Sequence, residues 1–157
     1  MSKLLLFTDG SVNTKTKIGY GAYLFLKEAE LSENSLNNKV NVERFENTSS
    51  TKLELQTLLF ALAKITNSET KIIVYTDSQN IIRLPERRKR LEQNDFRNSN
   101  NELLKNHELY RDFFEIIDQL DIEFIKVKGH QPSSQKDTIN RIFTLVDRTA
   151  RKALREE

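Results

Sequence analysis

Four acidic residues occupy positions where the surrounding sequence predicts burial, and this constrains the fold more than any other feature of the chain. Asp9 and Asp77 each close a short apolar run. Glu54 and Asp147 each lie on the apolar stripe of an expected helix. Burying an unpaired carboxylate costs on the order of several kcal/mol, so four of them require a compensating charge. One or two divalent cations would compensate all four.

Hydrophobic periodicity predicts five strands and four helices along the 157 residues. The expected strands are 3–9, 19–27, 38–45, 71–76 and 122–127. The expected helices are 55–66, a short one ending near residue 84, 106–120 and 138–155. The short helix should be capped by Asp77 or Ser78 and ended by Pro85, and residues 92–101 should form a polar loop.

The order of these elements predicts an α/β fold, with a five-stranded mixed sheet and helices on both faces. Three strands joined by hairpins are followed by strands that helices connect, and right-handed crossovers make the latter parallel. We expect one domain that spans residues 1–157. Ligands of such sheets bind at the carboxyl ends of the parallel strands. Asp9 and Asp77 are expected at two such ends, on neighbouring strands.

Simpler interpretations exist for two of the four acids. Asp9 could belong to a turn, and Asp77 could only cap a helix. Glu54 and Asp147 resist such explanations, because each should face the sheet. Four carboxylates carry the charge that two divalent cations neutralise, which is the arrangement used for in-line phosphoryl displacement. The chain has no cysteine, so oxygen or imidazole ligands are expected, and these favour Mg²⁺ or Mn²⁺.

The charge of the chain is nearly balanced overall but uneven locally. The formal net charge is +2, whereas residues 83–90 carry five basic side chains against one acidic one. Such a cluster suits a polyanion, although a solvated helix face is the simpler interpretation of the run alone. No apolar run approaches the length that spans a bilayer, so no membrane association is expected. The lack of cysteine is compatible with the expected cytoplasmic location.

Five short motifs together resemble the type 1 ribonuclease H family. They are Thr8-Asp9-Gly10-Ser11, Lys52-Leu53-Glu54-Leu55, Tyr75-Thr76-Asp77-Ser78-Gln79, Lys128-Gly129-His130 and Val146-Asp147-Arg148. The resemblance spans nearly the whole chain in the right order. It implies a ribonuclease H-like fold and an endoribonuclease that hydrolyses the RNA strand of RNA/DNA hybrids, leaving 5′-phosphate ends.

The same resemblance implies roles for individual residues. Four carboxylates would be catalytic metal ligands for two ions in the substrate complex: Asp9, Glu54, Asp77 and Asp147. His130, in a loop, would assist proton transfer or product departure. Small polar side chains would approach the nucleic-acid backbone: Asn13, Ser50, Thr51, Ser78, Gln79 and Asn106. A basic handle would grip the RNA/DNA hybrid duplex: Arg87, Arg88, Lys89 and Arg90. A monomer is expected.

Three alternatives to this interpretation remain open at the level of the sequence. A related two-metal DNA nuclease of the same superfold would share the four acids. A non-catalytic nucleic-acid-binding module is expected to lack one or more of them, and none is lost here. A purely structural α/β domain would leave four inward-facing carboxylates unexplained.

Overall fold

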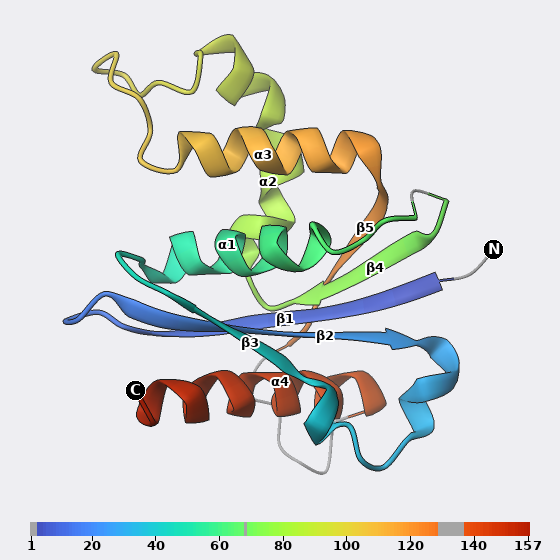
Figure 1. Ribbon diagram of the computed structural model, residues 1–157. Coiled ribbons are helices and arrows are strands. Elements are labelled where there is room, and N and C mark those ends of the chain that lie inside the picture. The colour runs from blue at the N-terminus through green and yellow to red at the C-terminus, as the bar shows by residue number, and fades with distance from the viewer. Residues whose placement is uncertain (1–2, 68, 129–136) are drawn as a thin grey trace.

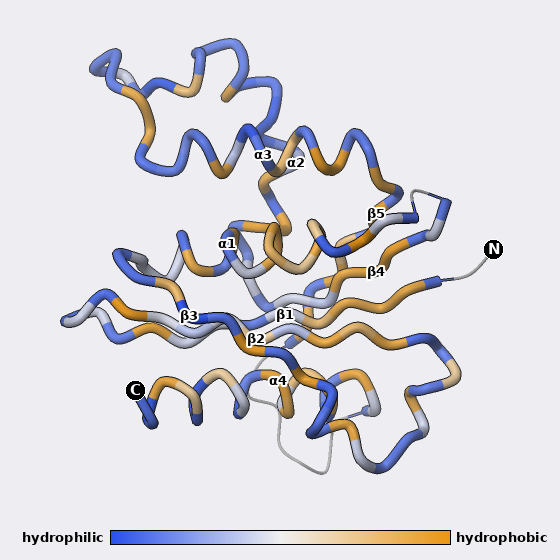
Figure 2. Tube along the Cα trace, in the orientation of Figure 1, coloured by the Kyte–Doolittle hydropathy of each residue, from blue (hydrophilic) through white to orange (hydrophobic). Residues whose placement is uncertain are grey.

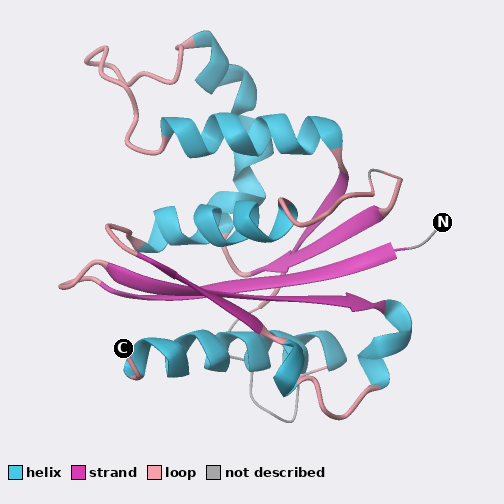
Figure 3. Ribbon diagram, in the orientation of Figure 1, coloured by secondary structure: helices cyan, strands magenta, loops and turns pink. Residues whose placement is uncertain are grey.

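Five strands form one mixed sheet in the computed structural model of the chain, which describes residues 3–67, 69–128 and 137–157 (Figures 1 and 3). The strands are β1 (Lys3–Asn13), β2 (Ile18–Lys27), β3 (Asn41–Phe45), β4 (Lys71–Thr76) and β5 (Asp121–Lys126). They lie in the order β3-β2-β1-β4-β5. β1, β2 and β3 pair antiparallel, whereas β4 pairs parallel with β1 and with β5. The predicted five-stranded mixed sheet is confirmed.

Helices cover both faces of this sheet, as predicted. They are α1 (Ser50–Leu62), α2 (Gln79–Gln93), α3 (His107–Gln119) and α4 (Thr138–Arg155), with the short 3-10 helices η1 (Glu28–Ser32) and η2 (Asn37–Lys39) between β2 and β3. Figure 1 shows α1, α2 and α3 on one side of the sheet and α4 on the other. The sheet therefore separates two hydrophobic cores.

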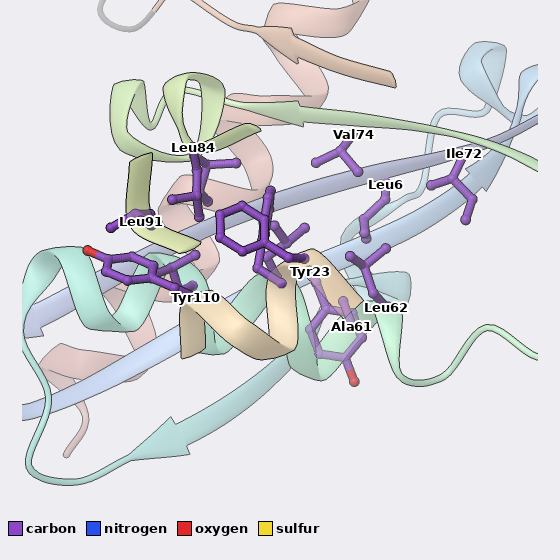
Figure 4. Packing of buried hydrophobic residues seen from close by; sticks show 14 of the residues in the cluster. Leu6, Tyr23, Ala61, Leu62, Ile72, Val74, Leu84, Leu91 and Tyr110 are labelled. Carbon is purple, nitrogen blue, oxygen red and sulfur yellow. The ribbon is translucent and has the colours of Figure 1, made fainter. Parts of the chain in front are cut away.

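Alternating side chains of the central strands supply both cores. Leu6 faces α1 and α3 and packs in the first cluster. Figure 4 shows part of this cluster, including Leu6, Val74 and Leu84. Phe7 faces the other way and packs in the second cluster against α4. Successive side chains of a strand point to opposite faces, which explains this division. Figure 2 shows the apolar segments concentrated on the strands and on the sides of the helices nearest to them.

β1 is longer than the sequence predicts. Its pairing with β2 continues from Leu4–Lys27 to Asn13–Ile18, so the strand does not end at Asp9. The parallel pairing of β1 with β4 stops earlier, at Phe7 and Tyr75. Asp9 thus lies inside a strand, but just beyond the part that β4 covers.

The prediction that Pro85 ends the second helix is wrong. α2 begins after Ser78, whose hydroxyl accepts a hydrogen bond from the backbone N–H of Ile81 at 3.1 Å, and it continues through Pro85 to Gln93. A proline inside a helix costs about 3 kcal/mol. Leu84 and Leu91 are buried on either side of it, and each contributes about 1.5–3 kcal/mol. Their burial offsets the cost of the proline, so the expected polar loop begins only after α2.

α1 approaches the β1–β2 hairpin closely because glycines lie beneath it. A Cβ atom at Gly21 would come within 2.0 Å of the Oγ1 atom of Thr57. That hydroxyl is itself fixed, because it donates to the backbone oxygen of Leu53 at 2.7 Å. At Gly10 a Cβ atom would lie 2.8 Å from the Leu53 side chain. The first turns of α1, which carry Glu54, are therefore held directly on the hairpin.

Glu157, two residues after the end of α4, is hydrogen-bonded to two strands on the antiparallel side of the sheet. The carboxylate of Glu157 accepts hydrogen bonds from Arg44 Nε at 2.8 Å and Nη2 at 3.0 Å, and another from the Tyr20 hydroxyl. The hydrogen bond from Arg44 is the main reason why the pKa of Glu157 falls to about 2. The contact therefore stabilises this end of α4 at pH values above the ordinary glutamate pKa of 4.5. This stabilisation is lost as the pH falls towards 2.

We expect Arg44→Gln to raise the pKa of Glu157 towards 4.5, the ordinary value for glutamate, and to speed amide exchange in the last turn of α4. A carboxyl-carbon NMR titration and hydrogen exchange above pH 5 would measure both effects. Lys39→Gln, which removes a different exposed ion pair with Glu33, is the matched control. An unchanged titration of Glu157 in the Arg44 variant would contradict this assignment.

Candidate active site

The four acids that the sequence singles out come from four different elements. Asp9 lies on β1, Glu54 in the first turns of α1, Asp77 directly after β4 and Asp147 on α4. The Asp9 and Asp147 side chains are hydrogen-bonded to each other, and the charge of Asp77 acts on Asp9. The charge of Asp77 also acts on Glu54. These pairwise effects link the four in the order Asp147–Asp9–Asp77–Glu54 at one end of the sheet, and we call this set the acidic row.

Burial and like charge make Asp9 a weak acid. Desolvation is the largest cause, followed by the hydrogen bond with Asp147 and the charges of Asp77 and Asp147, and together they raise the pKa of Asp9 to about 9. A hydrogen bond from the backbone of Gly10 opposes this shift. At neutral pH and without a cation, Asp9 therefore carries a proton, which it can donate to the Asp147 carboxylate.

Glu54 is held at the other end of the row. Burial raises its pKa, a hydrogen bond from Ser78 lowers it, and the charge of Asp77 raises it further. The Ser78 hydroxyl donates to Glu54 Oε2 while it caps α2. Ser78 is only 4% exposed. In the structure Ser78 therefore holds Glu54 and starts α2, and its predicted contact with the nucleic-acid backbone stays a prediction.

The donor set of the acidic row suits a hard cation. All four side chains offer carboxylate oxygens, which Mg²⁺ prefers, and Mg²⁺ needs few protein ligands. The acids do not form a preformed cage: within the described part of the chain, no three acidic or histidine side chains are gathered as a metal cluster. Two of them have competing partners, since Glu54 bonds to Ser78 and Asp147 accepts from Arg151 Nε at 3.1 Å. A cation would have to compete with these contacts.

His130 lies outside the described residues, so its predicted part in proton transfer stays a prediction. Among the other predicted substrate contacts, Ser50 and Thr51 are exposed in the first turn of α1. Asn13 is exposed too, but its side-chain oxygen accepts from the backbone N–H of Lys15 at 2.9 Å and shapes the hairpin turn. Asn106 is half-buried at the start of α3.

The predicted basic handle divides into parts with different surroundings. Arg88 turns towards α3, where its guanidinium bonds both Asp118 oxygens at 2.6 and 2.7 Å and lies 5.2 Å from the centre of the Phe114 ring. Lys89 is exposed. Arg88 therefore joins two helices, and its predicted grip on a duplex is not supported by its position.

Arg87 and Arg90 have different surroundings from Arg88. They line a hollow of about 420 Å³, together with Arg97 from the segment after α2. No acidic side chain lines the hollow, which makes it suited to an anion. The sequence interpretation missed Arg97, because this residue lies outside the basic run. Segment 94–104 folds back towards α2 and so places Arg97 beside Arg87 and Arg90.

Comparisons with known proteins agree with this geometry. The RNase H family model matches residues 1–155. The chain belongs to the RNase H family. The resemblance inferred from the five motifs is thereby confirmed. A ribonuclease H of Caldicellulosiruptor saccharolyticus is 28% identical over 159 residues, which cover 99% of each chain.

Solved structures show the same fold. The solution structure of the PFV RNase H domain has a TM-score of 0.68 at 21% identity and covers 95% of this chain and 94% of its own. The foamy viral protease-reverse transcriptase in complex with dsDNA has a TM-score of 0.65 at 12% identity and covers 95% of this chain and 93% of its own. Both likenesses confirm the ribonuclease H-like fold.

Membership of the RNase H family supports a ribonuclease H-type nuclease activity, and the family generally uses divalent metal ions. Among the helices of the described residues, none combines the length and the apolar character needed to cross a membrane.

We expect Asp9→Asn to stabilise the protein in the presence of a chelator. An amide can donate to Asp147 as the protonated acid does, and it needs no proton from solution at a pH where the unfolded aspartate is ionised. The wild type should lose stability as the pH rises from about 3.8, the ordinary aspartate pKa, to about 9. At pH 8 the variant should be more stable by about 1–3 kcal/mol.

Thermal or urea unfolding across this pH range would measure the difference. Asp112→Asn, which changes an exposed acid of α3, is the matched control. Equal pH dependence in the wild type and the Asp9 variant would show that Asp9 ionises normally.

Proposed function

We propose that the protein is an endoribonuclease that hydrolyses the RNA strand of RNA/DNA hybrids and leaves 5′-phosphate ends. The observation that carries the proposal is the acidic row at one end of the sheet, in a chain that the RNase H family model matches from residue 1 to 155. Four acids this near to one another, one of which stays protonated without a cation, disfavour the folded metal-free state, and bound cations would relieve the cost.

Asp9, Glu54, Asp77 and Asp147 would hold Mg²⁺, or Mn²⁺ in its place, with two ions in the substrate complex. Bound cations of this kind lower the pKa of an attacking water and stabilise the departing 3′-oxygen. The Asp9 carboxyl must release its proton before the whole row can act as a ligand set. Binding of the ions should therefore weaken as the pH falls. His130 is proposed to assist proton transfer near the leaving group.

The remaining side chains would bind and orient the hybrid. Arg87 and Arg90, together with Arg97 in the hollow beside α2, offer guanidinium groups to backbone phosphates. Five polar side chains are proposed to contact the minor groove and the 2′-hydroxyl groups that distinguish RNA from DNA: Asn13, Ser50, Thr51, Gln79 and Asn106. Recognition of this kind depends on the shape of the duplex more than on its base sequence.

The proposal predicts Mg²⁺-dependent cleavage of labelled RNA/DNA hybrids, but not of RNA/RNA or DNA/DNA duplexes, and no cleavage in a chelator. Asp77→Asn should lower the rate by more than the roughly 10- to 100-fold typical of residues that only support a metal ligand. Hybrid binding should survive this change, and Asp112→Asn should keep full activity. Cleavage of DNA/DNA duplexes would favour the related DNA nuclease, whereas hybrid binding without cleavage would favour a non-catalytic module.

Replacement of Arg87, Arg90 and Arg97 by Gln should raise the KM for the hybrid and leave kcat nearly unchanged, because the hollow lies away from the acidic row. Each lost phosphate contact should reduce the slope of log affinity against log salt by about 0.9. Binding titrations from 50 to 200 mM salt, about the range over which such contacts weaken, would measure the slope. Arg155→Gln at the end of α4 is the control. An unchanged slope would remove the hollow from the interface.

A further inference from the structure

Lys126 stands beside the acidic row and has no role in the function proposed so far. It is the last residue of β5 and pairs in register with Thr76, the residue before Asp77. It shares a face of the sheet with Phe124, two residues earlier, which packs in the first core. Its ammonium group donates a hydrogen bond to the side-chain oxygen of Gln79, the first residue of α2.

This contact fixes the polarity of an amide group. A lysine ammonium only donates hydrogen bonds, so the end of Gln79 that it contacts must be the carbonyl oxygen. The NH₂ end of Gln79 then points away from Lys126 and can only donate. Without the ammonium, the Gln79 amide could rotate and offer either its donor end or its acceptor end to a ligand.

The backbone places these two exposed residues next to each other. The strand ladder continues past Lys126, because the Val127 N–H donates to the Thr76 oxygen at 2.8 Å. The start of α2 is fixed by the Ser78 cap. The pair therefore holds the end of β5 against the start of α2, next to Asp77.

We infer that Lys126 is a positioning residue that makes Gln79 a donor-only reader of the hybrid and so keeps cleavage independent of base sequence. The inference rests on the proposed function, in which Gln79 contacts the minor groove. Every base pair presents acceptor atoms there, and only guanine adds an amino group that donates. A Gln79 that can only donate finds a partner at every base pair. One that can rotate would also accept from guanine and would favour it.

The test compares cleavage-site profiles on a pool of hybrids in which each position carries each base pair. Lys126→Met removes the ammonium and keeps the stem, whereas Lys126→Arg keeps a donor-only group. Gln79→Ala and the double variant Gln79→Ala/Lys126→Met complete a cycle. Lys3→Met is the matched control. It removes an exposed lysine at the first residue of β1, at the end of the sheet away from the acidic row.

The wild type, the Arg variant and the Lys3 control should show flat profiles. Lys126→Met should favour guanine at one position by about 2- to 10-fold, the size expected of one hydrogen bond. This preference should vanish in the double variant, whose KM and kcat should match those of Gln79→Ala. A flat profile for Lys126→Met would overturn the inference. The inference would also be overturned if Lys126→Met lowered the affinity for the hybrid equally in the wild type and in Gln79→Ala. That result would mean that Lys126 binds phosphate directly.

A measurement on the free protein separates this inference from the proposed function. The side-chain NH₂ resonances of Gln79, identified by their loss in Gln79→Ala, should shift in Lys126→Met and stay in place in Lys3→Met. If they do not shift, Lys126 does not hold Gln79, and the inference fails even if the enzyme is active. If they shift but the wild type cleaves no hybrid, the proposed function fails while the contact stands.

Discussion

The repulsion among four carboxylates at one end of the sheet is the constraint on which the rest of this structure depends. The repulsion is evident at Asp9, whose pKa is raised to about 9 by partial burial, by a hydrogen bond with Asp147 and by the charges of Asp77 and Asp147. The metal-free protein tolerates it by keeping a proton on Asp9 and by giving Glu54 and Asp147 partners in Ser78 and Arg151. A site of this kind holds its acids close together at the expense of stability, as functional sites commonly do.

The surrounding fold supplies the rigidity that such a site needs. Gly21 lets α1 lie directly on the β1–β2 hairpin, because any larger residue would collide with Thr57. The Ser78 hydroxyl fixes Glu54 and the start of α2 with one side chain. These contacts leave the acids little freedom to separate, so the charge must be compensated by a proton or a cation.

Much of this arrangement could be predicted from the sequence, because burial periodicity and charge are local properties. The five strands, the pairing of the strands that precede Asp9 and Asp77, and the element that carries each acid follow from such patterns. Other features depend on contacts between distant residues. Pro85 continues a helix because Leu84 and Leu91 are buried on either side of it, and β1 extends past Asp9 because β2 pairs with it to Asn13. The basic run divides because Arg88 pairs with Asp118 of α3, whereas Arg87 and Arg90 line the hollow. His130 lies in a part of the chain that the structure does not describe.

The two hydrophobic cores lie on opposite sides of the sheet, and the acidic row reaches from one to the other. Glu54 is carried by the helix that packs in the first core, and Asp147 by the helix that packs in the second. The spacing of these two acids therefore depends on the packing of both cores. Under the proposed function, the cleavage rate should therefore report how the two layers are aligned.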